Sequence, residues 1–251
     1  MYFKSTLLLG SLCASLAFLS CSKEPDDPYG SALPPSGVGS VRLYDEFTNR
    51  LPDAGMRVYI ENSVPLTLSE AITDSNGQFV LNNIPIGTFH LVYEKEGYGT
   101  YKSIHTRSAV NTASTIFFDV TPSLGKISST RITDLQLETR GDSILLHITT
   151  DPPGFASSLR YVRLLFSTDS NIDHQHFESF TAPTGIGINP FTKFISMALL
   201  RNLGFQSGQT VYIRAYGDSY FTNEYFNYAT RESILPNLNA DAAPAVSLVI
   251  P

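Results

Sequence analysis

Short runs of alternating apolar and polar residues recur along the first half of this chain. They lie at residues 41–44, 56–61, 79–81, 89–93 and 116–120. Because successive side chains of a strand point to opposite faces, such runs predict strands with one buried face. No long segment repeats its apolar residues at helical spacing. We therefore expect this half to consist of β-strands.

The second half shows the same alternation at residues 144–149, 161–166, 211–216 and 246–250. One apolar face on each strand is typical of an antiparallel sandwich, in which two sheets bury their inner faces against each other. The predicted fold class is therefore all-β, with two tandem β-sandwich domains.

Residues 38–122 are predicted to form the first domain and residues 131–251 the second, with a short connection at 123–130. Prolines alternate with small polar residues through most of residues 21–37. A segment of this composition cannot bury a core, so we expect a flexible linker before the first domain. Its predicted role is to hold that domain away from a membrane.

The most distinctive part of the first domain contains two turn signals. Asn76-Gly77 predicts a hairpin turn, because both residues tolerate positive φ, and Pro85–Gly87 predicts a second turn. This stretch resembles the carboxypeptidase regulatory-like domain, a transthyretin-like β-sandwich. The matching positions are Asp74, Gly77, Phe79, Leu81, Ile84, Pro85, Gly87, Phe89, Leu91, Gly97 and Tyr98. The resemblance implies a spacer or interaction module. It does not imply peptidase activity, because the His-x-x-Glu zinc motif of the peptidases is absent.

The second domain carries a different resemblance. Residues 203–216 resemble the corner and central strand of fibronectin type III-like domains, although the usual core tryptophan is missing. The resemblance implies a second β-sandwich. Together the two domains resemble the plan of Bacteroidetes lipoproteins encoded near glycan-uptake systems.

The N-terminus has the layout of a secretory signal. Lys4 precedes an apolar stretch from Leu7 to Leu19, which is too short to cross a bilayer core of about 30 Å as a helix. Phe18–Cys21 resembles the lipobox of a bacterial lipoprotein signal. The resemblance implies cleavage after residue 20 and a lipid on Cys21. The alternative is an ordinary signal peptide that is cut elsewhere.

A lipid on Cys21 would attach the protein to a membrane. Residues 22–27 resemble the acidic surface-export signal of Bacteroidetes lipoproteins, and a solvated acidic tail would have the same composition. We therefore expect a lipid-anchored outer-membrane protein that is exposed at the cell surface. Cys13 lies inside the signal, so the mature chain would have no thiol for a disulfide or a metal site.

Charge and motifs exclude several functions. The net charge of −6 argues against nucleic-acid binding, which needs a basic surface. His174-Gln175-His176 could present two imidazoles to a metal, but no clear third ligand accompanies them, and solvent-exposed polar side chains explain them better. Residues 74–77 resemble the start of a calcium loop, which a turn explains fully. We predict no metal, no cofactor and no catalytic residue.

Aromatic residues gather at residues 217–228, after the strand predicted at 211–216. Their rings could stack on sugar faces while neighbouring amide and carboxylate groups bind hydroxyls. The candidate ligand-binding residues are Asp218, Tyr220, Phe221, Asn223 and Tyr225. Packing of these rings against the end of the sandwich is the alternative role.

The sequence favours a non-enzymatic cell-envelope lipoprotein that acts as a binding or accessory module. Its partner would be a glycan, in glycan capture, or another protein, in outer-membrane assembly. A purely structural spacer is the first alternative. An enzyme whose site is built from dispersed residues is the second.

Overall fold

A computed structural model describes residues 35–61, 69–109 and 115–251, and these residues form strands with one short helix. The predicted all-β sandwich class is confirmed. The signal, Cys21 and residues 21–34 of the linker lie outside the described residues. Within the described ranges, no helix has the length and apolar character needed to cross a membrane.

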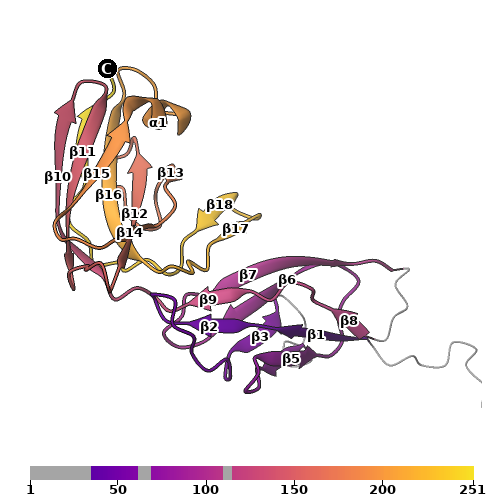
Figure 1. The fold of residues 1–251 in the computed structure, drawn as a ribbon. Helices are drawn as coiled ribbons and strands as arrows, with labels where there is room; N and C mark the ends of the chain where they lie inside the picture. The colour runs from indigo at the N-terminus through magenta and orange to yellow at the C-terminus, as the bar shows by residue number, and fades with distance from the viewer. Residues whose placement is uncertain (1–34, 62–68, 110–114) are drawn as a thin grey trace, which may run out of the picture. The chain divides into compact units, whose positions relative to one another are not determined.

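The first sandwich pairs a four-stranded sheet with a smaller one (Figure 1). The larger sheet has the order β4-β3-β6-β7, made by Glu70–Ile72, Arg57–Ile60, Gly87–Glu94 and Tyr101–Arg107. The smaller sheet has the order β5-β1-β8, made by Gln78–Leu81, Ser36–Ser40 and Thr115–Phe117. A parallel pair follows, made by β2 (Arg42–Tyr44) and β9 (Ser123–Gly125).

The alternating residues of the first sandwich face its core as predicted. Phe79 and Leu81 of β5 are buried, as are Phe89, Leu91 and Tyr93 of β6. Both strands contribute to one apolar cluster between the sheets. Burial of this apolar surface is the main favourable contribution to the stability of the sandwich.

The turn at Asn76-Gly77 forms, but the predicted hairpin does not. Strand β4 pairs with β3, whereas β5 pairs with β1 in the other sheet. Gly77 has a φ of +76°, while Asn76 is not among the residues with positive φ. The Asp74 carboxylate accepts hydrogen bonds from the backbone N–H groups of Asn76 (2.8 Å) and Gln78 (2.9 Å). The turn therefore carries the chain from one sheet to the other.

The last strand of the first sandwich also differs from the prediction. We expected a strand through Ile116, Phe118 and Val120, but β8 ends at Phe117 and Val120 is exposed. Strand β9 lies within the stretch that we expected only to connect the domains, and it pairs with β2. Leu124 of β9 is buried in the core of the first sandwich.

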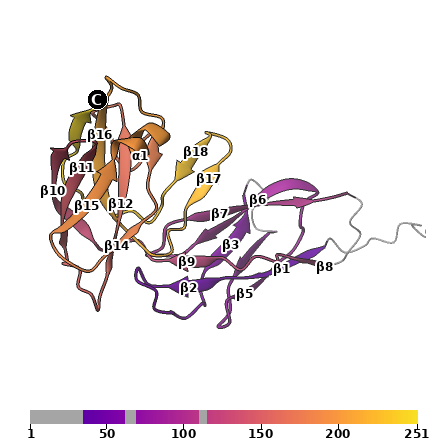
Figure 2. The same cartoon turned by 45° about the horizontal axis from the view of Figure 1, so that its top comes forward.

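The second sandwich has the sheets β10-β11-β15 and β13-β12-β16-β19, and β14 also pairs with β12. The first sheet comprises Arg131–Arg140, Ser143–Asp151 and Phe191–Ser196. The second comprises Ser179–Phe180, Arg160–Ser167, Thr210–Asp218 and Val246–Val249, with Thr184–Ile186 as β14. Helix α1 (Met197–Asn202) begins after Ser196, whose hydroxyl accepts a hydrogen bond from the Leu199 N–H. It lies at the end of the sandwich where the chain ends (Figures 1 and 2).

Strand β12 is buried on both faces, whereas the alternation predicted one buried face. Arg163 and Leu165 lie on the face predicted to be exposed, yet only 1% and 0% of their surfaces are accessible. A second small core covers this face. It consists of Leu165, Ile172, Tyr216, Leu235 and Leu238. The loop before β13 and the segment after β18 supply its outer residues. These segments cover the outer face of the sheet, which a simple two-sheet sandwich would leave exposed to solvent.

A short hairpin lies between β16 and β19 in the sequence. It is made by β17 (Tyr225–Asn227) and β18 (Glu232–Ile234), which pair antiparallel. Figure 2 shows it standing apart from the strands of the two main sheets.

The described residues of both sandwiches belong to one compact unit, Pro34–Pro251. Glycines permit close backbone approaches within it. A Cβ atom on Gly125 would lie 2.3 Å from the carbonyl oxygen of Phe221, and one on Gly217 would lie 1.8 Å from that of Thr130. Real Cβ atoms do not come so close to backbone oxygens, so these positions require glycine.

Two buried asparagines satisfy the backbone groups at this approach. Asn237 Nδ2 donates to the carbonyl oxygens of Gly125 (3.0 Å) and Phe221 (2.7 Å), and its Oδ1 accepts from the Gly99 N–H (3.1 Å). Asn223 Oδ1 accepts from the Gly125 N–H (2.9 Å), and its Nδ2 donates to the Gly99 carbonyl (3.0 Å). We call these five residues the joint.

Replacing Asn237 with Ala should destabilise the protein strongly. The change removes the hydrogen bonds of several buried backbone groups, and each unsatisfied group costs about 1–3 kcal/mol. We expect the free energy of unfolding, measured in urea, to fall by about 3 kcal/mol. Asn239→Ala is the matched control, because the Asn239 side chain accepts one hydrogen bond, from the Asp241 N–H. Equal losses for both variants would contradict the role given to the joint.

Candidate functional site

Two of the five predicted ligand-binding residues are held inside the protein. Asp218 is buried at the end of β16, where its Oδ2 lies 2.6 Å from Arg163 Nε. Burial raises the pKa of Asp218, and the Arg163 charge offsets part of this increase. Asn223 is buried in the joint. The polar groups of both residues are used by the protein itself.

The three predicted aromatic residues are more accessible. Tyr220 exposes 50% of its surface. Phe221 is partly buried against the Tyr44 ring, with a centroid distance of 4.2 Å. Tyr225 is also partly buried, and Lys102 Nζ lies 6.0 Å from its ring centroid. Of the five residues, Tyr220 offers the largest fraction of its surface to a ligand, and its binding role stays a prediction.

Arg163 fixes both ends of the loop that carries Tyr220. Besides its contact with Asp218, its Nη1 lies 2.9 Å from Glu224 Oε2. The guanidinium is also stacked over Phe180, 5.2 Å from the ring centroid. Removing one partner of such a buried pair strongly destabilises a protein, so the loop between the two carboxylates is firmly held.

Neighbouring rings fix the orientation of Tyr220. Its centroid lies 5.5 Å from that of Tyr161 and 4.9 Å from that of Phe221, both in edge-on geometry. Its backbone N–H donates to the Glu46 carbonyl at 3.0 Å. Edge-to-face contacts of this kind are favourable for aromatic pairs. We call Tyr44, Phe221, Tyr220 and Tyr161, taken in this order, the aromatic row.

A surface hollow lies at each of two members of this row, the partly buried Tyr161 and the exposed Tyr220. The first has a volume of about 340 Å³, and Phe47, Thr48, Asn49, Ser157, Ser158 and Tyr161 contribute to its lining. The second has a volume of about 300 Å³, and Tyr101, Ser123, Tyr220, Phe221, Thr222 and Glu224 contribute to its lining. Both volumes fall at the lower end of the range for small-ligand pockets, about 300–1,000 Å³.

The polar groups of these hollows are mainly uncharged. The hydroxyls of Thr48, Ser123, Ser157 and Ser158 make no hydrogen bond to any residue that the structure describes. Among the described lining residues there is no Lys or Arg, and Glu224 is the one carboxylate. The surface therefore offers free hydroxyls beside aromatic rings.

Sequence reasoning identified the loop with Tyr220 but missed the other half of this surface. Tyr161 was assigned to a strand, and Thr48 and Ser158 belong to loops without periodic signal. These residues come together only because the fold places residues 44–49, 156–161 and 219–224 next to one another.

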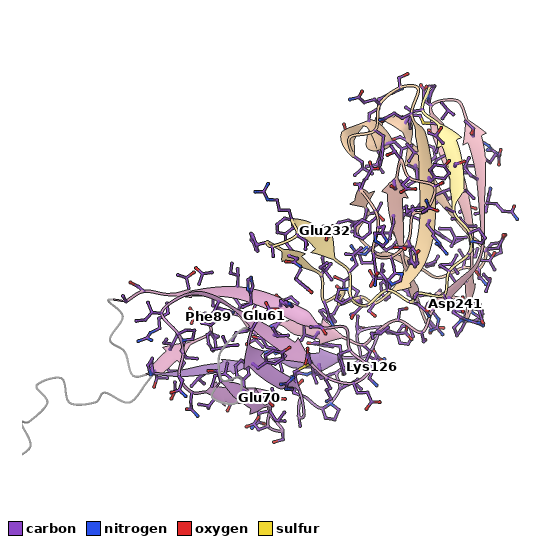
Figure 3. The ribbon with its side chains drawn as sticks, turned by 180° about the vertical axis from the view of Figure 1, so that it is seen from behind. Glu61, Glu70, Phe89, Lys126, Glu232 and Asp241 are labelled. Atoms are coloured by element: carbon purple, nitrogen blue, oxygen red, sulfur yellow. The ribbon has the colours of Figure 1, made fainter. Side chains whose placement is uncertain are left out.

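A third hollow, of about 510 Å³, lies between residues 174–177 and the β17–β18 hairpin, on which Figure 3 labels Glu232. Leu235 and Leu238 of the second small core contribute to its lining. His174 and His176 also line it. Within the described ranges, no group of three or more His, Cys, Asp or Glu residues is placed to hold a metal ion.

Asp173 organises the loop beside this hollow. Its Oδ1 accepts hydrogen bonds from the backbone N–H groups of Gln175 (2.7 Å) and His176 (2.8 Å), and lies 3.0 Å from His176 Nδ1. Burial alone would raise the pKa of Asp173, but the hydrogen bonds, chiefly that of the imidazole, lower it to about 2. The same hydrogen bond and charge raise the pKa of His176.

No family model matches the chain, and no curated protein matches it. Among solved structures, a Bacteroides uniformis protein provisionally described as carbohydrate-binding is 13% identical, with 86% of this chain and 99% of that chain covered and a TM-score of 0.32. A DUF3823 family protein from Parabacteroides merdae is 10% identical, with 86% and 99% covered and a TM-score of 0.30. The FN1–FN3 domains of chicken CNTN1 are 6% identical, with 86% and 68% covered and a TM-score of 0.29. Sequence identities and TM-scores this low do not establish a shared fold or function.

The His176 imidazole should titrate above its ordinary pKa of 6.5 in an NMR pH titration, because Asp173 stabilises its charged form. Asp173→Asn should lower the midpoint toward 6.5 or below. Stability gained from this pair is present below pH 6.5 and is lost as the pH rises through the folded-state pKa of His176. His105 is an internal control, because burial lowers its pKa. A midpoint for His176 that Asp173→Asn leaves unchanged would contradict this assignment.

Proposed function

We propose that this protein is a binding module that takes carbohydrate on the aromatic row. The observation that carries the proposal is the half-exposed Tyr220 ring, which neighbouring rings hold in place. It lines one hollow and contacts Tyr161, which lines the other, and both hollows have free hydroxyls. A fixed aromatic face complements the C–H face of a sugar. Ser and Thr hydroxyls both donate and accept hydrogen bonds, as the hydroxyls of a sugar require.

Binding without hydrolysis is supported by the carboxylates at this surface. Most glycoside hydrolases place two carboxylates on either side of the bond that they cleave. Glu224 is the one carboxylate among the described residues that line the two hollows, and it is paired with Arg163. The surface therefore suits recognition better than acid–base chemistry.

We further propose that a lipid on Cys21 anchors the module at the outer surface of a cell envelope. This proposal rests on the signal-like N-terminus and the cysteine that follows it. The first sandwich, which resembles the carboxypeptidase regulatory-like domain, would then be nearer the anchor in the sequence. An outer-membrane protein partner and a purely structural spacer are the competing roles.

Tyr220→Ala should lower the affinity for a bound polysaccharide at least tenfold, because aromatic side chains at the centre of an interface contribute about 2 kcal/mol or more. Affinity gel electrophoresis against a panel of plant and microbial polysaccharides provides the measurement. Phe194→Ala is the matched control, since Phe194 exposes 64% of its surface on β15, in the other sheet of the second sandwich. Retention of full affinity by Tyr220→Ala would remove the aromatic row as the site. Failure of every polysaccharide to bind would favour a protein partner or a spacer.

Cys21→Ser should release the protein from the membrane. Stable anchoring requires more than one acyl chain, and a lipoprotein cysteine carries several, so its loss should move the protein into the soluble fraction. Cell fractionation with immunodetection provides the measurement. Cys13→Ser, within the signal, is the control and should leave the protein in the membrane fraction. Membrane retention of Cys21→Ser would contradict lipid anchoring.

A further inference from the structure

We infer that the ligand of the aromatic row is an uncharged, linear oligosaccharide that crosses Tyr220 and occupies both hollows at once. This inference rests on the proposed carbohydrate-binding function and specifies the class and the length of its ligand. Three properties of the surface support it. They are the aromatic contact between the two hollows, the charge of their lining residues and the fixed position of the segments that form them.

The two hollows are joined by an aromatic contact. Tyr161 lines the first hollow and Tyr220 lines the second, and their ring centroids are 5.5 Å apart. The two hollows share no lining residue, so they are separate hollows that meet at the Tyr161–Tyr220 contact. A chain of sugars could place one part in each hollow and cross the Tyr161–Tyr220 contact between them. A compact monosaccharide would fill one hollow and leave the hydroxyls of the other unused.

The charge of the lining favours an uncharged ligand. The described lining residues include no Lys or Arg that could neutralise an acidic sugar. Their one carboxylate, Glu224, is engaged by Arg163 and is therefore a poor partner for an amino sugar. The chain as a whole has a net charge of −6, so an acidic glycan would also be repelled at longer range. Free hydroxyls remain as the main polar partners.

Both sandwiches contribute to each hollow. Thr48 of the first sandwich faces the same hollow as Ser158 of the second, and Ser123 of the first faces the same hollow as Thr222 of the second. A ligand that fills both hollows therefore touches several segments from the two sandwiches. The affinity for such a ligand depends on keeping these segments in fixed positions relative to one another.

The segments are already held before a ligand arrives. The Glu46 carboxylate accepts hydrogen bonds from Ser128 Oγ (3.0 Å) and the Ser129 N–H (2.8 Å), and the Glu46 carbonyl accepts one from the Tyr220 N–H. Together with the joint, these bonds link the loop at 45–49 to the loop at 219–224. Preorganisation of this kind lowers the entropy that binding must otherwise offset.

Calorimetric titration of the purified protein with a length series of uncharged oligosaccharides tests the inference. The series would run from glucose, mannose and xylose to longer oligomers of each sugar. Affinity should increase with length until both hollows are filled and then level off, with one oligosaccharide bound per protein. Oligogalacturonides of the same lengths, which are acidic, should bind at least tenfold more weakly.

Single hydroxyl deletions test whether one ligand reaches both hollows. Ser158→Ala and Ser123→Ala should each weaken binding of the longest oligosaccharide about three- to tenfold, the equivalent of one hydrogen bond. A short sugar should be affected by one of these changes at most. Ser207→Ala, at an exposed serine before β16, is the matched control and should have no effect.

The possible results separate this inference from the function on which it rests. Equal affinity for short and long sugars, two oligosaccharides per protein, or tight binding of oligogalacturonides would overturn the inference and leave carbohydrate binding intact. Binding of no saccharide of any length would overturn both. Loss of affinity in Ser158→Ala alone would also overturn the inference, because it would confine the ligand to the first hollow.

Discussion

The close approach of the chain at Gly125 is the constraint on which the candidate site depends. Absence of a side chain there lets the Phe221 carbonyl lie against β9, where a Cβ atom would be only 2.3 Å away. This contact removes backbone groups from water, and Asn223 and Asn237 replace the lost hydrogen bonds. The loop that follows β16 is therefore fixed on both sides of Phe221. Tyr220 owes its defined orientation to this arrangement.

Polar residues in this loop have a structural role that composition alone does not reveal. Asp218 and Asn223 are the residue types that bind sugar hydroxyls, and both lie inside the protein. Burying Asp218 is costly unless a charge partner is present, and Arg163 meets this need while also contacting Glu224. Asp218 and Asn223 therefore hold the loop, while Tyr220 between them is exposed to solvent.

Alternation predicted nine of the 19 strands that the structure describes, because one-sided burial leaves a direct period of two in the sequence. It did not predict long strands such as β7, β10 and β15. It failed where strand pairing and contacts between distant segments decide which side chains are buried. The Asn76-Gly77 signal specifies a turn but not which strands pair on either side, and β12 hides Arg163 and Leu165 under a distant segment. For the candidate site, the aromatic cluster pointed to the loop that carries the exposed Tyr220. Tyr161 and its neighbouring hydroxyls carried no local signal, since only the fold unites them with Tyr220.

Rigidity and the proposed recognition depend on different atoms of the same loops. The joint and the Glu46 contacts use backbone groups and buried side chains that are bonded to one another, whereas the hydroxyls of Thr48, Ser123 and Ser158 have no partner within the described ranges. Substitution of a free hydroxyl would therefore alter what the surface recognises without loosening its frame. Substitution of a joint residue would disturb both hollows together, because each draws on both sandwiches. If the surface binds as proposed, this separation would let exposed residues alone determine the ligand while the buried contacts keep the loops rigid.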